Sequence, residues 1–140
     1  MSIKYCTVTS KEELEQILTL QQANLWTNVN LEEKEKDGFV TVEHNFDILQ
    51  MFTEIDAVVP KDEKYMAMGQ ICVGKNYRNQ GIFRGLYNTM KQHVQPDFDS
   101  IITEVDAKNT RSLLAHYAVG FKELKTYFSD GRDWILISLK

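Results

Sequence analysis

Apolar residues recur along this chain with two spacings that predict different elements. Four apolar, β-branched runs are typical of strands, at residues 65–73, 100–105, 121–128 and 134–139. Two segments between them repeat apolar residues every three to four positions, as the buried faces of helices do, at residues 81–94 and 110–119. The second half of the chain therefore predicts strands that alternate with helices.

Turn residues mark where two of these elements end. Gly120 follows one predicted helix, and glycine is the usual residue just past a helix end. Asp130 and Gly131 lie between the last two strands, and this pair accepts the positive φ that a tight hairpin requires. We therefore expect a mixed α/β sheet, flanked by helices, that ends in a C-terminal antiparallel hairpin.

The first half of the chain also contains helix and strand patterns. Residues 3–8 predict a short strand, and Ser10 forms a capping box with Glu13 that starts a helix at Lys11. The apolar spacing of that helix predicts that one of its faces packs on a sheet. The remaining predictions are a helix over residues 30–38, a strand over 39–42, and a helix capped by Asn45 that carries Ile48, Met51, Phe52 and Ile55.

Length and composition narrow the class of protein. The 140 residues suit a single domain over residues 1–140, because a chain of this length buries enough surface without staples. A net charge of −4 with dispersed Lys and Arg provides no stripe that would bind nucleic acid. Cys6 and Cys72 lack the spacing of metal or redox sites, so we expect reduced thiols and no metal. No apolar run reaches the length of a membrane span, and we expect a soluble, cytoplasmic protein.

The turn that opens the helix over residues 81–94 is rich in hydrogen-bond donors. Gly81 has no side chain, and the amides from Asn79 through Phe83 point forward from a helix N-terminus with partial positive charge. Arg78 and Arg84 flank the turn and can add charge-assisted hydrogen bonds. This combination suits a pyrophosphate, and an ordinary turn with solvated arginines is the alternative.

Residues 69–75, GQICVGK, match most of the phosphate-loop pattern GxxxxGK[ST]. Asn76 replaces the Ser or Thr that would bind magnesium, and the residues between the two glycines have the character of a strand. A nucleotide hydrolase is therefore disfavoured. No GxGxxG follows a strand either, so a dinucleotide-binding fold has little support.

A polar wedge interrupts the helix over residues 110–119. Asn109, Ser112 and His116 fall within about 60° of one another on a helical wheel. Beside them, an apolar stripe contains Leu113, Leu114 and Tyr117, which predicts that Tyr117 is packed. The wedge indicates a site that includes a proton donor.

These segments resemble the GNAT superfamily of acyl-CoA-dependent N-acyltransferases. Residues 78–83, RNQGIF, look like its coenzyme A signature [QR]xxGx[GA], and Asn109, Ser112 and the pair Gly120 and Phe121 resemble its second motif. The resemblance runs through the second half of the chain. It implies a splayed, mostly antiparallel sheet whose opened strands, here within 68–73 and 100–105, admit the pantetheine arm of acetyl-CoA.

Two positions depart from the family pattern. Phe83 stands where the family has Gly or Ala, but its place in the apolar stripe of the helix predicts a buried side chain that leaves only its amide for phosphate. His116 stands where the family commonly places a tyrosine that protonates the departing thiolate. An imidazole can serve as that donor because its ordinary pKa is about 6.5. The alternative is a structural histidine.

The resemblance also implies site residues for direct acyl transfer. Those assigned to acetyl-CoA are Ile71, Cys72, Val73, Arg78, Asn79, Gln80, Gly81, Phe83, Arg84, Asn109 and Ser112. Amides near Cys72 and Val73 would stabilise the oxyanion, and Cys72 is not expected to be a nucleophile because its motif gives it no positioned base. Glu104 is the candidate general base, with Asp106 and His44 as further candidates. Solvated surface positions are the alternative for all three.

The acceptor pocket is the part that the sequence defines least. The resemblance points to Trp26, Phe39, His44 and Tyr127, with core packing as the alternative. In the family, the stretch that corresponds to Phe39–Gly69 usually contains one more β-hairpin than this chain has room for. Either the acceptor side is abbreviated, or residues are missing near positions 49–51, in which case the helix predicted there is an artefact.

These inferences favour an N-acetyltransferase that moves an acetyl group from acetyl-CoA to a small-molecule or peptidyl amine. The alternative is a non-catalytic module of the same fold that binds coenzyme A. Both a monomer and a homodimer agree with the sequence.

Overall fold

The structure is a computed structural model that describes residues 3–24, 45–69 and 71–140. It divides into two compact units: the first is Met1–Asn45 with Gln70–Thr89, and the second is Phe46–Gly69 with Met90–Lys140. The helix and strand predicted over residues 30–42 lie outside the described residues, as do Trp26, Phe39 and His44. The single domain over residues 1–140 stays a prediction.

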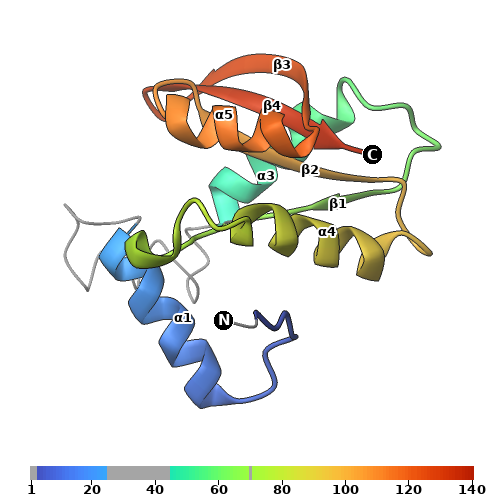
Figure 1. The fold of residues 1–140 in the computed structure, drawn as a ribbon. Helices are drawn as coiled ribbons and strands as arrows, with labels where there is room; N and C mark the ends of the chain where they lie inside the picture. The colour runs from blue at the N-terminus through green and yellow to red at the C-terminus, as the bar shows by residue number, and fades with distance from the viewer. Residues whose placement is uncertain (1–2, 25–44, 70) are drawn as a thin grey trace. The chain divides into compact units, whose positions relative to one another are not determined.

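The second unit contains a mixed sheet of four described strands (Figure 1). In chain order they are β1 (Tyr65–Ala67), β2 (Ser100–Asp106), β3 (Lys122–Ser129) and β4 (Arg132–Leu139). Their order in the sheet is β1-β2-β4-β3, in which β1 and β2 are parallel and the other two pairs are antiparallel. The predicted mixed, mostly antiparallel sheet is therefore confirmed.

The C-terminal hairpin is also confirmed. Ser129 pairs with Arg132, and the two residues between them, Asp130 and Gly131, have φ values of 53° and 72°. Positive φ at both positions is the geometry that matches the twist of the flanking strands. The indole Nε1 of Trp134 donates to the Ser129 carbonyl at 3.0 Å and ties the turn to β4.

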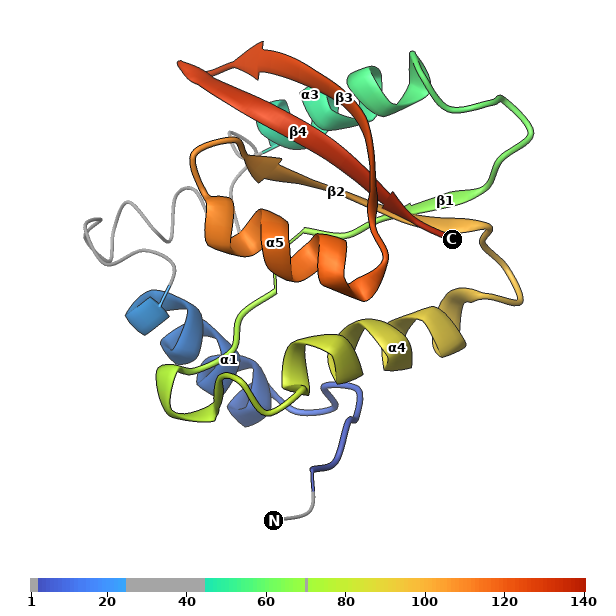
Figure 2. The ribbon, with the colours of Figure 1, turned by 45° about the horizontal axis from the view of Figure 1, so that its top comes forward.

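Helices α3 (Asn45–Asp56) and α5 (Thr110–Val119) lie on opposite faces of this sheet (Figure 2). On the α3 side, Met51 and Ile55 are buried in one cluster with Ile102 and Leu136 from the central strands. The helix predicted from the spacing of Met51 and Ile55 is confirmed. Helix α3 is continuous through residues 49–51, and both explanations of the short stretch between Phe39 and Gly69 stay predictions.

The first unit contains α1 (Lys11–Asn24), a 3-10 turn η2 (Lys75–Tyr77) and the first two turns of α4 (Ile82–Val94). Helix α1 begins where the capping box predicts. The Ser10 hydroxyl accepts from the Glu13 amide at 3.1 Å, and the Glu13 carboxylate accepts from the Thr9 amide at 3.0 Å. The bond to the Ser10 hydroxyl is thus formed as predicted. The Glu13 carboxylate, however, binds the amide of Thr9 instead of the amide of Ser10.

Residues 3–8 are not a strand, so that prediction is wrong. A strand is stabilised when its neighbours cover one face and its backbone groups find a ladder partner. Ile3 and Val8, the two ends of the predicted strand, remain 39% and 41% exposed. These two apolar side chains therefore do not mark the buried face of a strand.

The strand predicted over residues 65–73 is also too long, because β1 ends at Ala67. The Met68 amide still donates to the Ile102 carbonyl at 2.9 Å. The Met68 carbonyl, however, accepts the buried Thr103 hydroxyl at 2.8 Å, so a side chain supplies the next bond at the end of the ladder. The register of β1 with β2 stops at Ile102, where the splayed sheet is expected to open.

Candidate functional site

The turn between Gly74 and α4, in the first unit, has the backbone geometry expected of a ligand-binding loop. Asn79 and Gly81 both adopt positive φ, 62° and 79°. Among the described atoms, none lies within 4 Å of the Cβ that a side chain at Gly81 would add. Glycine is therefore favoured here by the backbone conformation, and crowding by described atoms plays no part.

Gly81 is also the residue from which α4 begins. The Gly85 amide donates to the Gly81 carbonyl at 2.9 Å, which is the first bond of the helix. The amides of Ile82, Phe83 and Arg84 therefore lie in the first turn, where helix geometry gives an amide no partner within the helix. The first turn of α4 carries no acidic residue. These amides and the helix dipole suit a phosphate group.

The two arginines that flank this turn differ in their surroundings. Arg78 is half-buried, and its Nε donates to the Val73 carbonyl at 3.0 Å, so that this side chain closes the loop from Val73. Arg84 is exposed on the first turn of α4. Arg78 thus has a structural contact that the sequence did not predict.

Phe83 is half-buried, less than the buried side chain that its spacing predicts. Its ring meets Tyr87 edge to face with 5.2 Å between centroids, and Tyr87 is fully buried. The sequence did not predict the close approach of Tyr5 to Gly85 on this helix. A Cβ at Gly85 would collide with the phenol oxygen of Tyr5, so glycine at this position makes room for the N-terminal segment.

Cys72 has the surroundings of a neutral thiol. Burial raises its pKa, and the charge of Arg78 offsets that effect only in part. Its Sγ lies 3.8 Å from the Leu20 carbonyl. Because the thiolate is the nucleophilic form, these surroundings agree with the expectation that Cys72 does not form an acyl-enzyme. Cys6 is exposed, and neither thiol is in a disulfide.

In the second unit, the polar wedge of α5 forms one connected chain. The Asn109 Oδ1 accepts from the Ser112 amide at 3.2 Å and caps the helix. His116 Nδ1 lies 2.7 Å from the Ser112 carbonyl and 3.3 Å from its hydroxyl. Since a carbonyl only accepts, the proton is on Nδ1 when the ring is neutral. The structure therefore brings these three predicted residues together.

His116 is buried, with only 2% of its surface exposed. Its ring meets Phe121 edge to face at 5.1 Å between centroids, and its carbonyl accepts from the amides of Gly120 and Phe121. Burial lowers the pKa of His116, and the bond to Ser112 offsets this in part. A neutral, packed ring supports the structural alternative, so the proton-donor role continues below as a proposal.

The apolar stripe predicted beside the wedge is partly wrong. Leu113 is buried, but Leu114 is 68% exposed and Tyr117 is 37% exposed. The Tyr117 hydroxyl donates to the Glu123 carboxylate at 3.3 Å. The wheel grouped these residues by polarity, whereas the sheet selects the face centred on Leu113 and His116, because a histidine with satisfied hydrogen bonds can be buried.

The candidate base and one pocket residue meet on the opposite face of the sheet. Glu104 lies on β2 and Tyr127 lies on β3, with β4 between them. The Tyr127 hydroxyl donates to the Glu104 carboxylate. Tyr127 is 9% exposed and belongs to the core cluster below α3. Its ring therefore packs in the core while its hydroxyl makes a polar contact.

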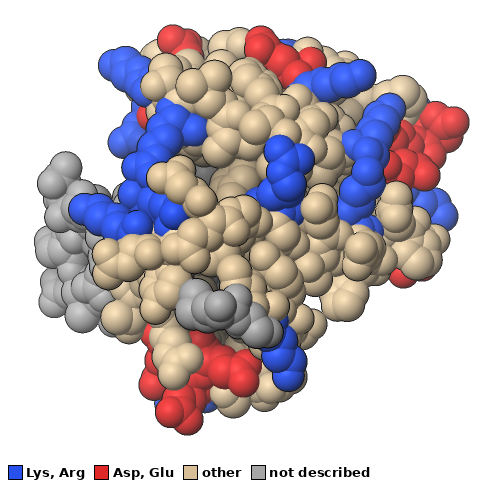
Figure 3. Space-filling view, viewed as in Figure 1, with Lys and Arg blue, Asp and Glu red and all other residues tan. Residues whose placement is uncertain are grey.

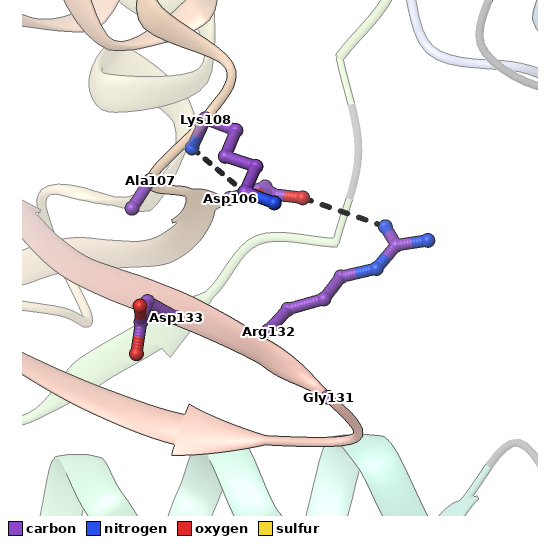
Figure 4. Close-up of a pocket in the computed structure, with 6 residues that line it drawn as sticks. All are labelled: Asp106, Ala107, Lys108, Gly131, Arg132 and Asp133. Atoms are coloured by element: carbon purple, nitrogen blue, oxygen red, sulfur yellow. Dashed lines mark hydrogen bonds and ion pairs between the residues drawn. The ribbon is translucent and has the colours of Figure 1, made fainter.

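Asp106, another candidate base, is held at the end of β2 (Figure 4). Its Oδ1 accepts from the Lys108 amide at 2.9 Å, and its Oδ2 lies 3.5 Å from the Arg132 guanidinium. These residues line a hollow of about 460 Å³ together with Ala107, Gly131 and Asp133. The sequence located the hairpin turn but not this hollow, because its lining comes from two segments far apart in the chain.

One face of the molecule shows how its basic side chains are distributed. On the face drawn in Figure 3, Lys and Arg side chains form separate groups among uncharged atoms. Among the described residues, no cluster of three His, Cys, Asp or Glu side chains could hold a metal ion. None of the helices in the described part is long and apolar enough to cross a membrane.

Comparison with known proteins gives a match in structure only. No family model and no curated protein sequence matches the chain. A chain of the NatC complex, solved with Gag peptide and CoA, superposes with a TM-score of 0.62 at 17% identity, over 97% of this chain and 95% of that one. Arabidopsis thaliana NAA60 with a bisubstrate analogue gives 0.52 at 19% identity, over 61% of this chain and 55% of that one.

Nourseothricin acetyltransferase gives a TM-score of 0.50 at 18% identity, over 57% of this chain and 52% of that one. The chain thus spans about half the length of NAA60 and of the nourseothricin enzyme, and nearly all of the NatC chain. The similar region confirms the fold predicted from the sequence. The protein has the fold of the GNAT acetyltransferases.

Proposed function

We propose that this protein is an N-acetyltransferase that uses acetyl-CoA as the acyl donor. The observation that carries the proposal is the turn at the start of α4. It combines positive φ at Asn79 and Gly81 with open space at Gly81 and a first helical turn of forward-pointing amides. The fold shared with acetyltransferases adds support.

The residues at this turn fit a pyrophosphate. The amides of Ile82, Phe83 and Arg84 would donate to its oxygens, and Arg84 would add a charge-assisted bond. Arg78 would stabilise the loop through its contact with Val73. Main-chain groups of Ile71, Cys72 and Val73 would hold the pantetheine arm, and Asn109 and Ser112 are assigned to the cofactor through the family motif alone.

Acetyl-CoA would supply an acetyl group that is activated as a thioester. Glu104 would accept a proton from the attacking amine, which must be neutral to form the new C–N bond. Amides near Cys72 and Val73 would stabilise the negative charge on the carbonyl oxygen. His116, when it also carries a proton on Nε2, would give that proton to the sulfur as the C–S bond breaks, so that the products are an amide and a free thiol.

The acceptor is proposed to be a small-molecule amine or an exposed amino group of a peptide. NatC was solved with a Gag peptide and NAA60 with a bisubstrate analogue, which favours testing peptides alongside small amines. Tyr127 is the described residue assigned to the pocket.

A second function is a module that binds coenzyme A without catalysis. The burial and lowered pKa of His116 favour this alternative, because a neutral, packed imidazole is a weak proton donor. Both functions require binding of coenzyme A, so binding alone does not separate them.

The test is release of thiol from acetyl-CoA across a panel of small amines and peptides, with CoA affinity measured by calorimetry on the same protein. The proposal expects amine-dependent thiol release and an acetylated product detected by mass spectrometry. Saturable CoA binding with no turnover on any amine would favour the non-catalytic module. Absence of both would contradict both functions.

A further inference from the structure

Two serine hydroxyls are buried on the α3 side of the sheet. Ser100 opens β2 and is 3% exposed, and Ser138 lies near the end of β4 and is 6% exposed. Neither Oγ makes a hydrogen bond to an atom of the described residues. A buried hydroxyl without a hydrogen bond is costly, so native proteins satisfy such groups with protein atoms or with ordered water. The two hydroxyls therefore form a candidate site for a small polar ligand.

Both hydroxyls lie on the same face of neighbouring strands. Ser138 pairs with Ile102, and Ser100 is two residues before Ile102 on β2. Side chains two residues apart in a strand share a face, and Ile102 belongs to the core cluster below α3. Diagonal neighbours of this kind have Cα atoms about 7–8 Å apart, and their side chains come closer. This arrangement suits one water molecule, which bridges two oxygens up to about 5.5 Å apart.

A buried carboxylate oxygen lies at the same end of the sheet. Glu63 comes two residues before Tyr65, and Tyr65 pairs with Ser100. The Glu63 Oε1 is buried and lies 3.0 Å from the ammonium of Lys140, as an ion pair without hydrogen-bond geometry. Glu63 precedes β1 and Lys140 follows β4, and these two strands flank β2. The ion pair therefore crosses β2 at its start, beside Ser100.

Charge and hydrogen-bonding capacity decide the class of ligand. The ammonium of Lys140 balances the carboxylate of Glu63, so this end of the sheet favours neither a cation nor an anion. A carboxylate oxygen only accepts hydrogen bonds, whereas a hydroxyl both donates and accepts. A ligand that satisfies all three oxygens must therefore be able to donate as well as accept. Water has this capacity, and a buried water typically makes about three hydrogen bonds.

We propose that one internal water molecule binds Ser100, Ser138 and the Oε1 of Glu63. It joins β2, β4 and the segment that leads into β1. The described pairing of β1 with β2 covers Tyr65–Ala67, so a further link at this end stabilises a short pair of parallel strands. This site is separate from the proposed transferase chemistry and does not depend on it.

Urea unfolding of Ser100→Ala and of Ser138→Ala tests the site through the sign of the effect. Each substitution removes one hydroxyl from the water, so the equilibrium constant of unfolding should rise about fivefold. A hydroxyl without a partner predicts the opposite, because removing an unsatisfied buried group lowers that constant. An unchanged or lowered constant in either variant would overturn the proposal.

The double variant Ser100→Ala/Ser138→Ala tests whether the hydroxyls share one ligand. With a shared water, the combined rise should be smaller than the product of the two single effects. Thr103→Val is the matched control, because it removes a buried hydroxyl of β2 that donates directly to the Met68 carbonyl at 2.8 Å. Its effect should multiply with that of Ser100→Ala. A full product in the serine pair would contradict a shared water.

Crystal diffraction at high resolution observes the ligand itself in the full chain, without coenzyme A. We expect one water oxygen within about 3.2 Å of both serine hydroxyls and of the Glu63 Oε1 in wild type, and its loss in the double variant. A direct hydrogen bond between the two serines, or no water at the ordered site, would overturn the proposal. Because this readout needs no turnover, the proposal can fail while the transferase function holds.

Discussion

Single residues decide the chemistry, and His116 is the one whose two roles compete most directly. A structural role needs only the ring, which packs on Phe121 and bonds to Ser112. A catalytic role also needs a proton that can be given to a leaving group. Substitutions that keep the ring and remove its nitrogens separate the two roles.

His116→Phe keeps an aromatic ring beside Phe121 and removes both nitrogens. If His116 donates the proton, kcat should fall on the order of 10²-fold while the Kd of CoA stays near the wild-type value. Steady-state kinetics and calorimetry measure the two quantities. Tyr117→Phe is the control, because Tyr117 lies at the surface against Glu123. Normal turnover in His116→Phe together with loss in Tyr117→Phe would reverse the assignment.

The lowered pKa of His116 also makes a prediction for stability. Its ordinary value is 6.5, and burial places the folded value below this. As the pH falls through 6.5, the unfolded chain binds a proton that the folded protein does not, so the free energy of unfolding decreases. Above this range the contribution is constant. Urea unfolding should show this decline in wild type and a shallower one in His116→Phe, and equal slopes would contradict a buried neutral imidazole.

At the scale of elements, α5 shows how capping and ligand binding can involve the same residue. Asn109 caps the helix through Ser112 and is also assigned to the cofactor. Asn109→Ser keeps a capping oxygen, whereas Asn109→Ala removes it and should cost about 1 kcal/mol of stability. Thermal unfolding and CoA titration measure the two effects. Asn109→Ser with normal stability and normal CoA affinity would limit Asn109 to the cap.

The elements that local chemistry determines could be predicted from the sequence. Gly120 at φ 121° and the pair Asp130 and Gly131 set two chain reversals, and α5 has the bounds that its apolar spacing predicts. The errors arise where a partner element decides the outcome. Residues 3–8 have apolar side chains without a covering face, and β1 ends at Ala67, where the Thr103 hydroxyl binds the next carbonyl.

The candidate site was predicted to a similar extent. The turn at Gly81 and the grouping of Asn109, Ser112 and His116 follow from spacing along the chain. The Tyr127 contact with Glu104 depends on strand order, since β4 enters between β2 and β3 out of sequence. The spacing of apolar residues does not predict the order of strands in a sheet.

At the scale of the whole molecule, two compact units share helix α4, whose first turn follows the proposed phosphate-binding turn. The fold extends over 97% of the chain in the match with the NatC chain. With a net charge of −4, the protein has no overall positive field to attract a polyanion. In the proposed function the backbone of this turn binds the pyrophosphate of coenzyme A, which makes Gly81 the position to test.

The most direct test is a calorimetric titration of CoA into wild type, Gly81→Val and Gly131→Val. Both glycines have positive φ, 79° and 72°, and neither has a described atom within 4 Å of an added Cβ. The two variants should therefore carry a similar backbone strain of about 1–2 kcal/mol, which unfolding measurements check. We expect saturable binding by wild type and Gly131→Val, and a Kd at least about tenfold weaker for Gly81→Val. No saturable binding by folded wild type, or equal Kd values for the two variants, would contradict the account.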